Sequence, residues 1–304
     1  NGGHYVIPYS IGEPFLITYS RKMMQEENLD DPYELYKSGE WNWDKFVSMM
    51  EQFVGNAPMG TYRYGINGDF GKEALISTGH TIVNNENGLL VNNIDDEKIA
   101  DAEALLQEIA QKGLYRINWI GHFPSDGTIL FFAMGDWALK ESNALNKDKD
   151  LMAVPFPKPE GNDKYYISCD YNARMLVKNS AKGEAVATYL KCERLAAEEP
   201  GCKEAAKAAA LAEGSADSKF EDSYLTEEQY DVIQEYLSSE SVCPIFDFAY
   251  GMGGGMYGVD SRNNGAAVNV LTTAFLNGTP YGSWEELRDA YKDRIISETE
   301  KFNQ

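Results

Sequence analysis

The sequence predicts an α/β fold, because apolar segments of strand length alternate along the chain with amphipathic segments of helix length. The clearest strand covers residues 129–133. These five consecutive apolar residues are too few for a globular helix and suit a strand that is covered on both faces. Gly135 then allows a sharp turn into a short helix. The clearest helix covers residues 96–112, where apolar side chains recur at helical spacing. Its inward face holds Ile99, Leu105, Leu106 and Ile109.

Trp137 follows the turn at the carboxyl end of the strand 129–133. Open α/β folds bind ligands at this edge of the sheet, so the indole is well placed to offer an aromatic face to a molecule in a cleft. Large aromatic residues are more often packed in a core, and this alternative stays open for Trp137.

The first part of the chain predicts two strands, a helix and a second helix start. Residues 4–9 form a short strand closed by a proline, residues 10–14 a loop, residues 15–19 a second strand and residues 21–28 a short helix. The next helix opens with Trp43 and carries an apolar stripe at helical spacing, which predicts a core face. This stripe holds Phe46, Met49, Met50 and Phe53.

The second half of the chain continues the alternation. It predicts helices at 183–198, 204–213, 226–237 and 283–302, and an extended segment at 242–246. Two of these helices begin with the residue pair of a capping box, in which a hydroxyl side chain and a Glu or Gln three residues later satisfy backbone amides. The pairs are Thr226 with Gln229 and Ser283 with Glu286.

Length and charge narrow the class of protein. The 304 residues are enough for two lobes, and no apolar run approaches the length that crosses a bilayer. The chain opens at Asn1 with neither an initiator methionine nor an apolar leader, so we expect a processed or trimmed start. The 27 basic and 48 acidic residues give a formal net charge of −21, which would repel nucleic acid and anionic membranes over most of the surface.

Four cysteines leave the redox compartment open. Cys192 and Cys202 lie on either side of a Pro-Gly pair, and we expect them to form a disulfide if the protein is exported. Cys169 and Cys243 would then be the second pair of one of three possible pairings. No pair has CxxC spacing, which argues against zinc and thioredoxin-like chemistry, and we expect no metal and no cofactor.

The order of several weak motifs resembles a known family. Five segments follow one another in the same order as in the extracellular solute-binding proteins of carbohydrate ABC importers. They are the strand around Tyr5 to Tyr9, the aromatic strand 15–19, the Lys-bearing helix at 21–27, the acidic loop ending at Pro32 and the Trp-Asp-x-Phe helix start at 43–46. The similarity is greatest to the family 1 group that includes the maltodextrin-binding proteins. It implies a type II periplasmic-binding-protein-like fold with two lobes and a hinge, and a structural role for Trp41 and Trp43.

The resemblance also implies candidate ligand contacts. The strand and Met-Gly-x-Trp turn match the segment whose tryptophan stacks on sugar in relatives, which favours Trp137. Asp136 would hydrogen-bond sugar hydroxyls, or instead be the N-cap of the next helix. Residues 62–66 match the next family strand, and the loop after it places Asp69 and Phe70 near ligand. In relatives an aromatic residue near a later helix start lies against the ligand, and the candidates here are Phe246, Phe248, Tyr250 and Tyr257. Of these four, we include Phe248, Tyr250 and Tyr257 among the predicted ligand contacts.

The chain departs from the family at its start, where relatives have roughly a hundred more residues. We therefore expect residues 9–165 and 226–304 to form a nearly complete α/β lobe. Residues 1–8 and 166–225 would supply a hinge strand and the remaining part of the other lobe, which would be incomplete in this chain.

Other chemistries find little support. Residues 253–258 match GxGxxG but lack the preceding strand of a dinucleotide site. Residues 260–265 resemble a calcium loop, yet Arg262 at the third position opposes the ion. His4, His80 and His122 belong to no catalytic motif. Paired carboxylates of a glycosidase have no fixed local spacing, so a carbohydrate-active enzyme stays open as an alternative.

The sequence therefore predicts a non-enzymatic substrate-binding component of an ABC transporter that binds a carbohydrate, with an oligosaccharide favoured, for import. A surface glycan-binding or sensing module without transport is the other alternative. The implied partners are the carbohydrate and the transporter permease subunits, and no nucleic acid. We expect a bacterial monomer that is extracellular, at the cell surface or periplasmic, and that associates with a membrane only through a lipid anchor absent from this chain.

Overall fold

The computed structural model describes residues 6–124, 126–146, 150–212, 223–257, 265–278 and 280–304. Its main sheet has the strand order β3-β6-β2-β7, in which β3 and β6 are parallel and β2 runs antiparallel to both β6 and β7. These strands are β2 (Phe15–Ser20), β3 (Tyr64–Gly68), β6 (Ile129–Gly135) and β7 (Leu151–Val154). The carboxyl ends of β3, β6 and β7 therefore meet the start of β2 at one edge.

The apolar strand is the buried centre of this sheet, as predicted. Residues 129–133 are fully buried, and the strand continues to Gly135. The aromatic rings of Phe46 and Trp41 pack on Phe131, at ring-centroid distances of 5.2 Å and 5.8 Å. The stripe predicted from helical spacing thus faces the core.

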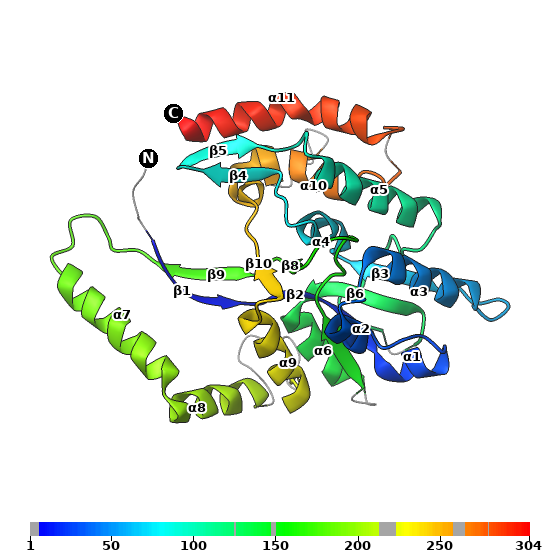
Figure 1. Cartoon of the computed structure of the whole chain (residues 1–304), viewed down its shortest axis with the longest axis horizontal. Helices are drawn as coiled ribbons and strands as arrows, with labels where there is room; N and C mark the ends of the chain where they lie inside the picture. The colour runs from blue at the N-terminus through cyan, green and yellow to red at the C-terminus, as the bar shows by residue number, and fades with distance from the viewer. Residues whose placement is uncertain (1–5, 125, 147–149, 213–222, 258–264, 279) are drawn as a thin grey trace.

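Helices cover this sheet (Figure 1). They are α1 (Arg21–Glu26), α2 (Pro32–Ser38), α3 (Trp43–Gly55), α4 (Phe70–Ser77), α6 (Asp136–Leu145) and α9 (Glu227–Ser238). The capping box of Thr226 and Gln229 is present in full at the start of α9.

A second hydrophobic cluster lies beside the main sheet, under the long C-terminal helix (Figure 1). It is built from the hairpin β4 (Val83–Glu86) and β5 (Leu89–Asn92), α5 (Glu97–Gln111), the 3-10 turn η1 (Phe248–Gly251), the π turn η2 (Gly253–Tyr257), α10 (Ala267–Thr273) and α11 (Trp284–Asn303). Ser283 caps α11 by accepting a hydrogen bond from Glu286 N, whereas the Glu286 carboxylate accepts from Gly282 N instead of completing the box.

Two strand pairs lead away from the main sheet. β1 (Ile7–Gly12) pairs antiparallel with β9 (Asp170–Arg174), and β8 (Tyr165–Ile167) pairs parallel with β10 (Val242–Pro244). The prediction of a first strand closed by its proline and followed by a loop is wrong, because β1 continues to Gly12. Its register shifts between Pro8 and Ser10, and such an irregularity lets a strand accommodate a residue without a backbone N–H.

The helices α7 (Gly183–Glu198) and α8 (Pro200–Leu211) follow β9 and differ from the rest of the chain. The bounds of α7 are those predicted. In Figure 1 both helices lie apart from the main sheet, and no residue of either helix is buried. Amphipathic helices usually obtain most of their stability by packing an apolar face against the protein. The helix α7 differs, because none of its apolar residues is buried.

The cysteine predictions are wrong in this structure, since all four thiols are free. Cys192 lies in α7 and Cys202 in α8, and the chain bends at Glu199 between them, so the side chains stand on separate helices. Cys243 lies in β10, where it pairs with Tyr166, and Cys169 lies in the segment between β8 and β9.

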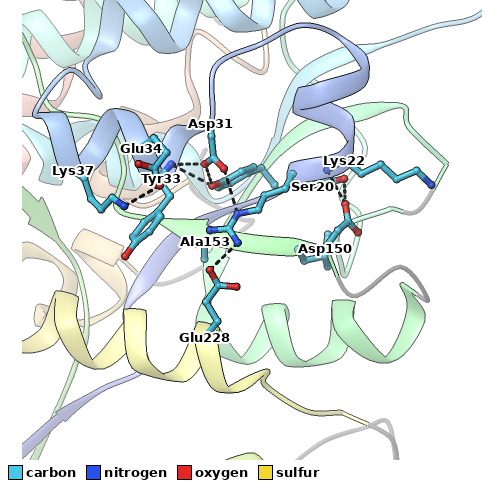
Figure 2. Close-up of polar contacts among 12 residues, drawn as sticks. Ser20, Lys22, Asp31, Tyr33, Glu34, Lys37, Asp150, Ala153 and Glu228 are labelled. Carbon is cyan, nitrogen blue, oxygen red and sulfur yellow. Dashed lines mark hydrogen bonds and ion pairs between the residues drawn. The ribbon is translucent and has the colours of Figure 1, made fainter.

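Polar contacts fix the end of β2 that lies away from the β3 and β6 carboxyl edge (Figure 2). Arg21 donates to Glu228 of α9 at 2.8 Å and lies 3.3 Å from the Asp31 carboxylate. Asp31 caps α2 by accepting from Tyr33 N at 2.9 Å. One guanidinium thus connects the starts of α1, α2 and α9.

Among the helices that the structure describes, none has the length and apolarity needed to cross a membrane.

Candidate functional site

The candidate site lies at the sheet edge where β3 and β6 end and β2 begins. Backbone hydrogen bonds fix its turns, because Asp69 N donates to Ala133 O at 2.8 Å and Asp136 N donates to Pro14 O at 3.1 Å. Asp69 and Asp136 thus follow two neighbouring parallel strands, as expected for a ligand site at the carboxyl edge of an α/β sheet.

Trp137 is the second residue of α6 and is 36% exposed, so it is not a core tryptophan. Its indole lies against the backbone of Gly135. A Cβ atom added to Gly135 would be 2.6 Å from the indole Nε1, a distance that real Cβ atoms do not adopt. Gly135 is therefore needed less for a turn than for the close approach of this ring.

Asp136 has only 8% of its surface exposed, and its Oδ1 has no hydrogen-bond partner. Its Oδ2 lies 3.6 Å from Lys140 Nζ, one helical turn later. Burial raises the pKa of this carboxyl, and Lys140 opposes the rise. The alternative of an N-cap role is wrong, because Gly135 is the capping residue and Asp136 is the first residue of the helix.

Asp69 precedes α4 and forms no side-chain cap. Burial raises its pKa as well, and the charge of Lys72 counteracts this. The loop predicted after Asp69 is instead the first turn of α4. Phe70 is buried in that turn and packs on Tyr115 with the ring centroids 6.2 Å apart, so its ring has no surface to offer a ligand.

Lys72 lies near two aromatic rings and a carboxylate at this edge. Its Nζ lies 3.6 Å from the Phe15 ring centroid, 5.7 Å from the Tyr250 ring centroid and 3.5 Å from the Glu73 carboxylate. Glu73 is buried and accepts the Ser168 hydroxyl at 2.5 Å. The start of β2, the turn η1 and the crossing from β8 to β9 therefore meet at Lys72 and Glu73.

The aromatic candidates of η1 lie close to this meeting point. Phe248 packs edge-on against Phe246 at 5.1 Å, and Phe246 packs against Tyr171 of β9 at 6.1 Å. Phe246 is exposed, whereas Phe248 and Tyr250 are half-buried. Position 257 ends the π turn η2, but the side chain of Tyr257 lies outside what the structure describes. The calcium-loop candidate at 260–264 also lies outside the described residues.

The side chain of Asp247 fixes the position of η1 through hydrogen bonds. Its buried carboxylate accepts backbone N–H groups of Ile82, Val83 and Ala249. Burial raises the pKa of Asp247 to about 6, and these three donors limit the rise. The carboxylate thus connects the turn that carries Phe248 and Tyr250 to the start of β4.

We expect this burial to make stability depend on pH. Because the pKa of Asp247 is higher in the folded state than its ordinary value, the folded chain binds the proton more tightly, and this stabilisation is lost as the pH rises toward 6 and above. Between about pH 4 and pH 7 the free energy of unfolding should fall relative to that of Asp247→Asn by about 2 to 3 kcal/mol. Urea titrations of both proteins at the two pH values measure this; a constant gap would contradict it.

Sequence reasoning missed the ionisable residues that surround Asp136 and Asp69. Glu13 and Asp170 lie close enough to Asp136 to interact with it electrostatically. The pKa of Glu13 is raised mainly by burial, and also by the negative charges of Asp170 and Asp136. Lys72 and Lys140 were also not predicted. Their spacing gave a signal, since each follows an aspartate by three or four residues on a helix. Within the described ranges no group of three or more His, Cys, Asp or Glu residues has the arrangement of a metal site.

Comparison with known proteins identifies the fold. No family model and no curated protein sequence matches the chain. Solved structures do match over nearly its whole length. The ABC transporter associated binding protein of B. animalis subsp. lactis Bl-04, in complex with β-1,6-galactobiose, is 16% identical with a TM-score of 0.59, and the match covers 99% of this chain and 74% of that one.

Two further structures agree. The galacto-N-biose/lacto-N-biose I-binding protein of the Bifidobacterium longum ABC transporter, in complex with lacto-N-biose, has a TM-score of 0.62 at 12% identity, covering 99% and 72% of the two chains. The cyclic α-maltosyl-1,6-maltose binding protein of Arthrobacter globiformis has a TM-score of 0.64 at 12% identity, covering 99% and 73%. The chain therefore has the type II periplasmic-binding-protein-like fold of ABC transporter sugar-binding proteins, as the sequence predicted.

Proposed function

We propose that this chain is the substrate-binding component of an ABC transporter and binds a carbohydrate at the carboxyl edge of β3 and β6. The observation that carries this proposal is the pair Asp136 and Trp137, an unpartnered carboxylate oxygen next to a partly exposed indole. The fold adds support, because two structures that share it are described as binding proteins of ABC transporters in complex with a sugar, and a third as a cyclic α-maltosyl-1,6-maltose binding protein.

The chemistry of the edge suits a neutral polyol. The apolar face of a pyranose ring can stack on the Trp137 indole, while sugar hydroxyls can donate to the part of the Asp136 carboxylate that stays exposed. Asp69, Phe248, Tyr250 and Tyr257 complete the proposed set of contacts, whereas Phe70 does not. No bond is broken in this function.

The lobes, the partners and the location are part of the proposal. The β1–β9 ribbon would be the hinge between the lobe formed by residues 9–165 and 226–304 and a second lobe to which 166–225 belong. The exposed α7 and α8 support this division, since no residue of either helix is buried. Ligand binding would close the lobes, and the closed monomer would dock on the permease subunits outside the cytoplasmic membrane.

A panel of monosaccharides and oligosaccharides tests the function by thermal shift. A ligand present at a hundred times its Kd stabilises the folded chain by about 2.7 kcal/mol, which raises the Tm by about 4 °C for a chain of this size. We expect at least one saccharide to give such a shift and to be recovered unchanged after incubation. A sugar that is cleaved or modified would favour an enzyme, and the absence of any shift would contradict the proposal.

A further inference from the structure

Two chain crossings connect the main sheet to the β1–β9 ribbon (Figure 1). One runs from β1 into β2, and the other runs from β8 into β9. They lie side by side, because Gly12 and Asp170 form the last residue pair of the ribbon and Phe15 N donates to Ser168 O at 2.9 Å. A change in the angle between the ribbon and the main sheet therefore takes place within these few residues.

Each crossing is tied to the main lobe directly beside the ribbon. Pro14 O accepts from Asp136 N at 3.1 Å, and the backbone oxygen of Ser168 is bonded to β2. Only one residue on each crossing then separates the ribbon from the tied residues, Glu13 on the first and Cys169 on the second. The backbone of Glu13 has a φ of 48°, in the left-handed region that residues with a Cβ atom seldom adopt. Such conformations cluster at ligand clamps and switch regions.

A buried carboxylate holds the second crossing from the side of α4. Glu73 is 1% exposed, and its Oε1 accepts the Ser168 hydroxyl at 2.5 Å while its Oε2 lies 3.4 Å from Ser168 N. Lys72 Nζ lies 3.5 Å from the same carboxylate and offsets its charge. A hydrogen bond to a charged acceptor is stronger than one between neutral groups, and more so away from water. Ser168 is therefore fixed through both its hydroxyl and its backbone.

The helix α4 is a rigid support for this contact. All of its residues except Lys72 are buried. A Cβ atom added to Gly71 would lie 2.0 Å from Thr272 O, so the backbone of α4 packs directly on α10. The Glu73 carboxylate is thus held by the main lobe and does not follow Ser168 if the crossing moves.

We propose that Glu73 is the positioning residue of the hinge. By holding Ser168 on α4, it keeps the bend between the ribbon and the main sheet at Glu13 and Cys169, next to the fixed residues. Hinges of this kind are a few residues at the ends of elements that absorb the backbone rotation, and a narrow hinge lets two lobes close in one geometry. This inference rests on the part of the proposed function that makes the β1–β9 ribbon a hinge, and it adds where the hinge bends and what holds it.

Amide hydrogen exchange of the ligand-free chain, followed for single amides by NMR, tests this inference. The amides of Phe15 and Asp136 tie the two crossings, so in the unchanged chain both should exchange at least about a hundredfold more slowly than free amides. Ser168→Ala removes the hydroxyl that Glu73 accepts. Exchange at Phe15 should then become about tenfold faster, the effect of losing one hydrogen bond to a charged group. Exchange in β6 should stay within about twofold.

Three further variants show which contact is responsible. Ser168→Thr keeps the hydroxyl and should keep exchange at Phe15 within about threefold of the unchanged chain. Glu73→Met is apolar and of similar size, and it should accelerate this exchange as Ser168→Ala does. The double variant should exchange no faster than either single variant, because both remove the same bond. Ser10→Ala is the control, since it removes a 3.1 Å contact with Asn172 inside the ribbon and should leave Phe15 unaffected.

Several outcomes would overturn the inference. Fast exchange of Phe15 or Asp136 in the unchanged chain would show that the bend is not confined. Unchanged exchange in Ser168→Ala, or additive acceleration in the double variant, would remove the role of Glu73. Acceleration throughout β6 would identify a residue that stabilises the whole lobe, and equal acceleration in Ser10→Ala would show that the ribbon itself holds the crossing.

The design separates this inference from the function on which it rests. If Glu73→Met does not fold, the comparison of Ser168→Ala with Ser168→Thr still decides whether the hydroxyl holds the crossing. All exchange measurements are made without ligand, so they decide the position of the hinge even if no saccharide binds and the proposed function fails.

Discussion

Replacing Trp41 by alanine should lower the free energy of unfolding by about 3 to 5 kcal/mol, the range for truncating a buried tryptophan. Trp41 is 0% exposed, and its ring meets Phe46 edge-on at 5.7 Å. Its Nε1 donates to Pro155 O at 2.8 Å, so the substitution also leaves a buried carbonyl without this partner. Urea unfolding followed by circular dichroism measures the loss.

Trp43 is the matched control because it lies two residues after Trp41, as the first residue of α3. It is only half-buried, and its Nε1 donates to the Ser77 hydroxyl at 3.2 Å. Trp43→Ala should therefore cost less than Trp41→Ala. Equal costs would contradict the difference in burial, and a loss of saccharide binding without a loss of stability in either variant would contradict the structural role that the resemblance implied for both.

Removing the Trp137 ring should weaken carbohydrate binding by tenfold or more while changing stability far less than Trp41→Ala does. The stacking contribution is about 0.5 to 1.5 kcal/mol beyond the area term, and the loss of apolar contact adds to it. A partly exposed ring leaves no closed cavity behind when it is truncated. Affinity by titration and the urea midpoint of Trp137→Ala measure the two effects separately.

Gly135→Ala offers a second route to the same conclusion. Its added Cβ would meet the indole at 2.6 Å and force the ring to move without removing it. Affinity should fall in this variant as well, since the stacking surface is displaced. A large fall in the urea midpoint of Trp137→Ala with intact affinity would instead identify a packing residue, and Gly135→Ala would then lose stability in parallel.

Local patterns in the sequence predicted much of the architecture. The apolar run 129–133 identified β6 because a strand buried on both faces needs an uninterrupted apolar sequence. Side-chain spacing identified the core face of α3, and the pair of Thr226 and Gln229 identified the start of α9. The turn after β6 placed Asp136 and Trp137 at the sheet edge. Each of these patterns involves residues that lie close together in the sequence, within the length of about one or two helical turns.

Only the tertiary structure decided which distant residues meet. Asn67 orders the loop at residues 116–120, about fifty positions away, and Asp247 binds amides at positions 82 and 83. The contact of Lys72 with the Phe15 ring likewise joins residues that are far apart in the sequence. Hydrogen-bonding and charged side chains have no periodic pattern that names a distant partner, because the fold as a whole sets their distance and their burial.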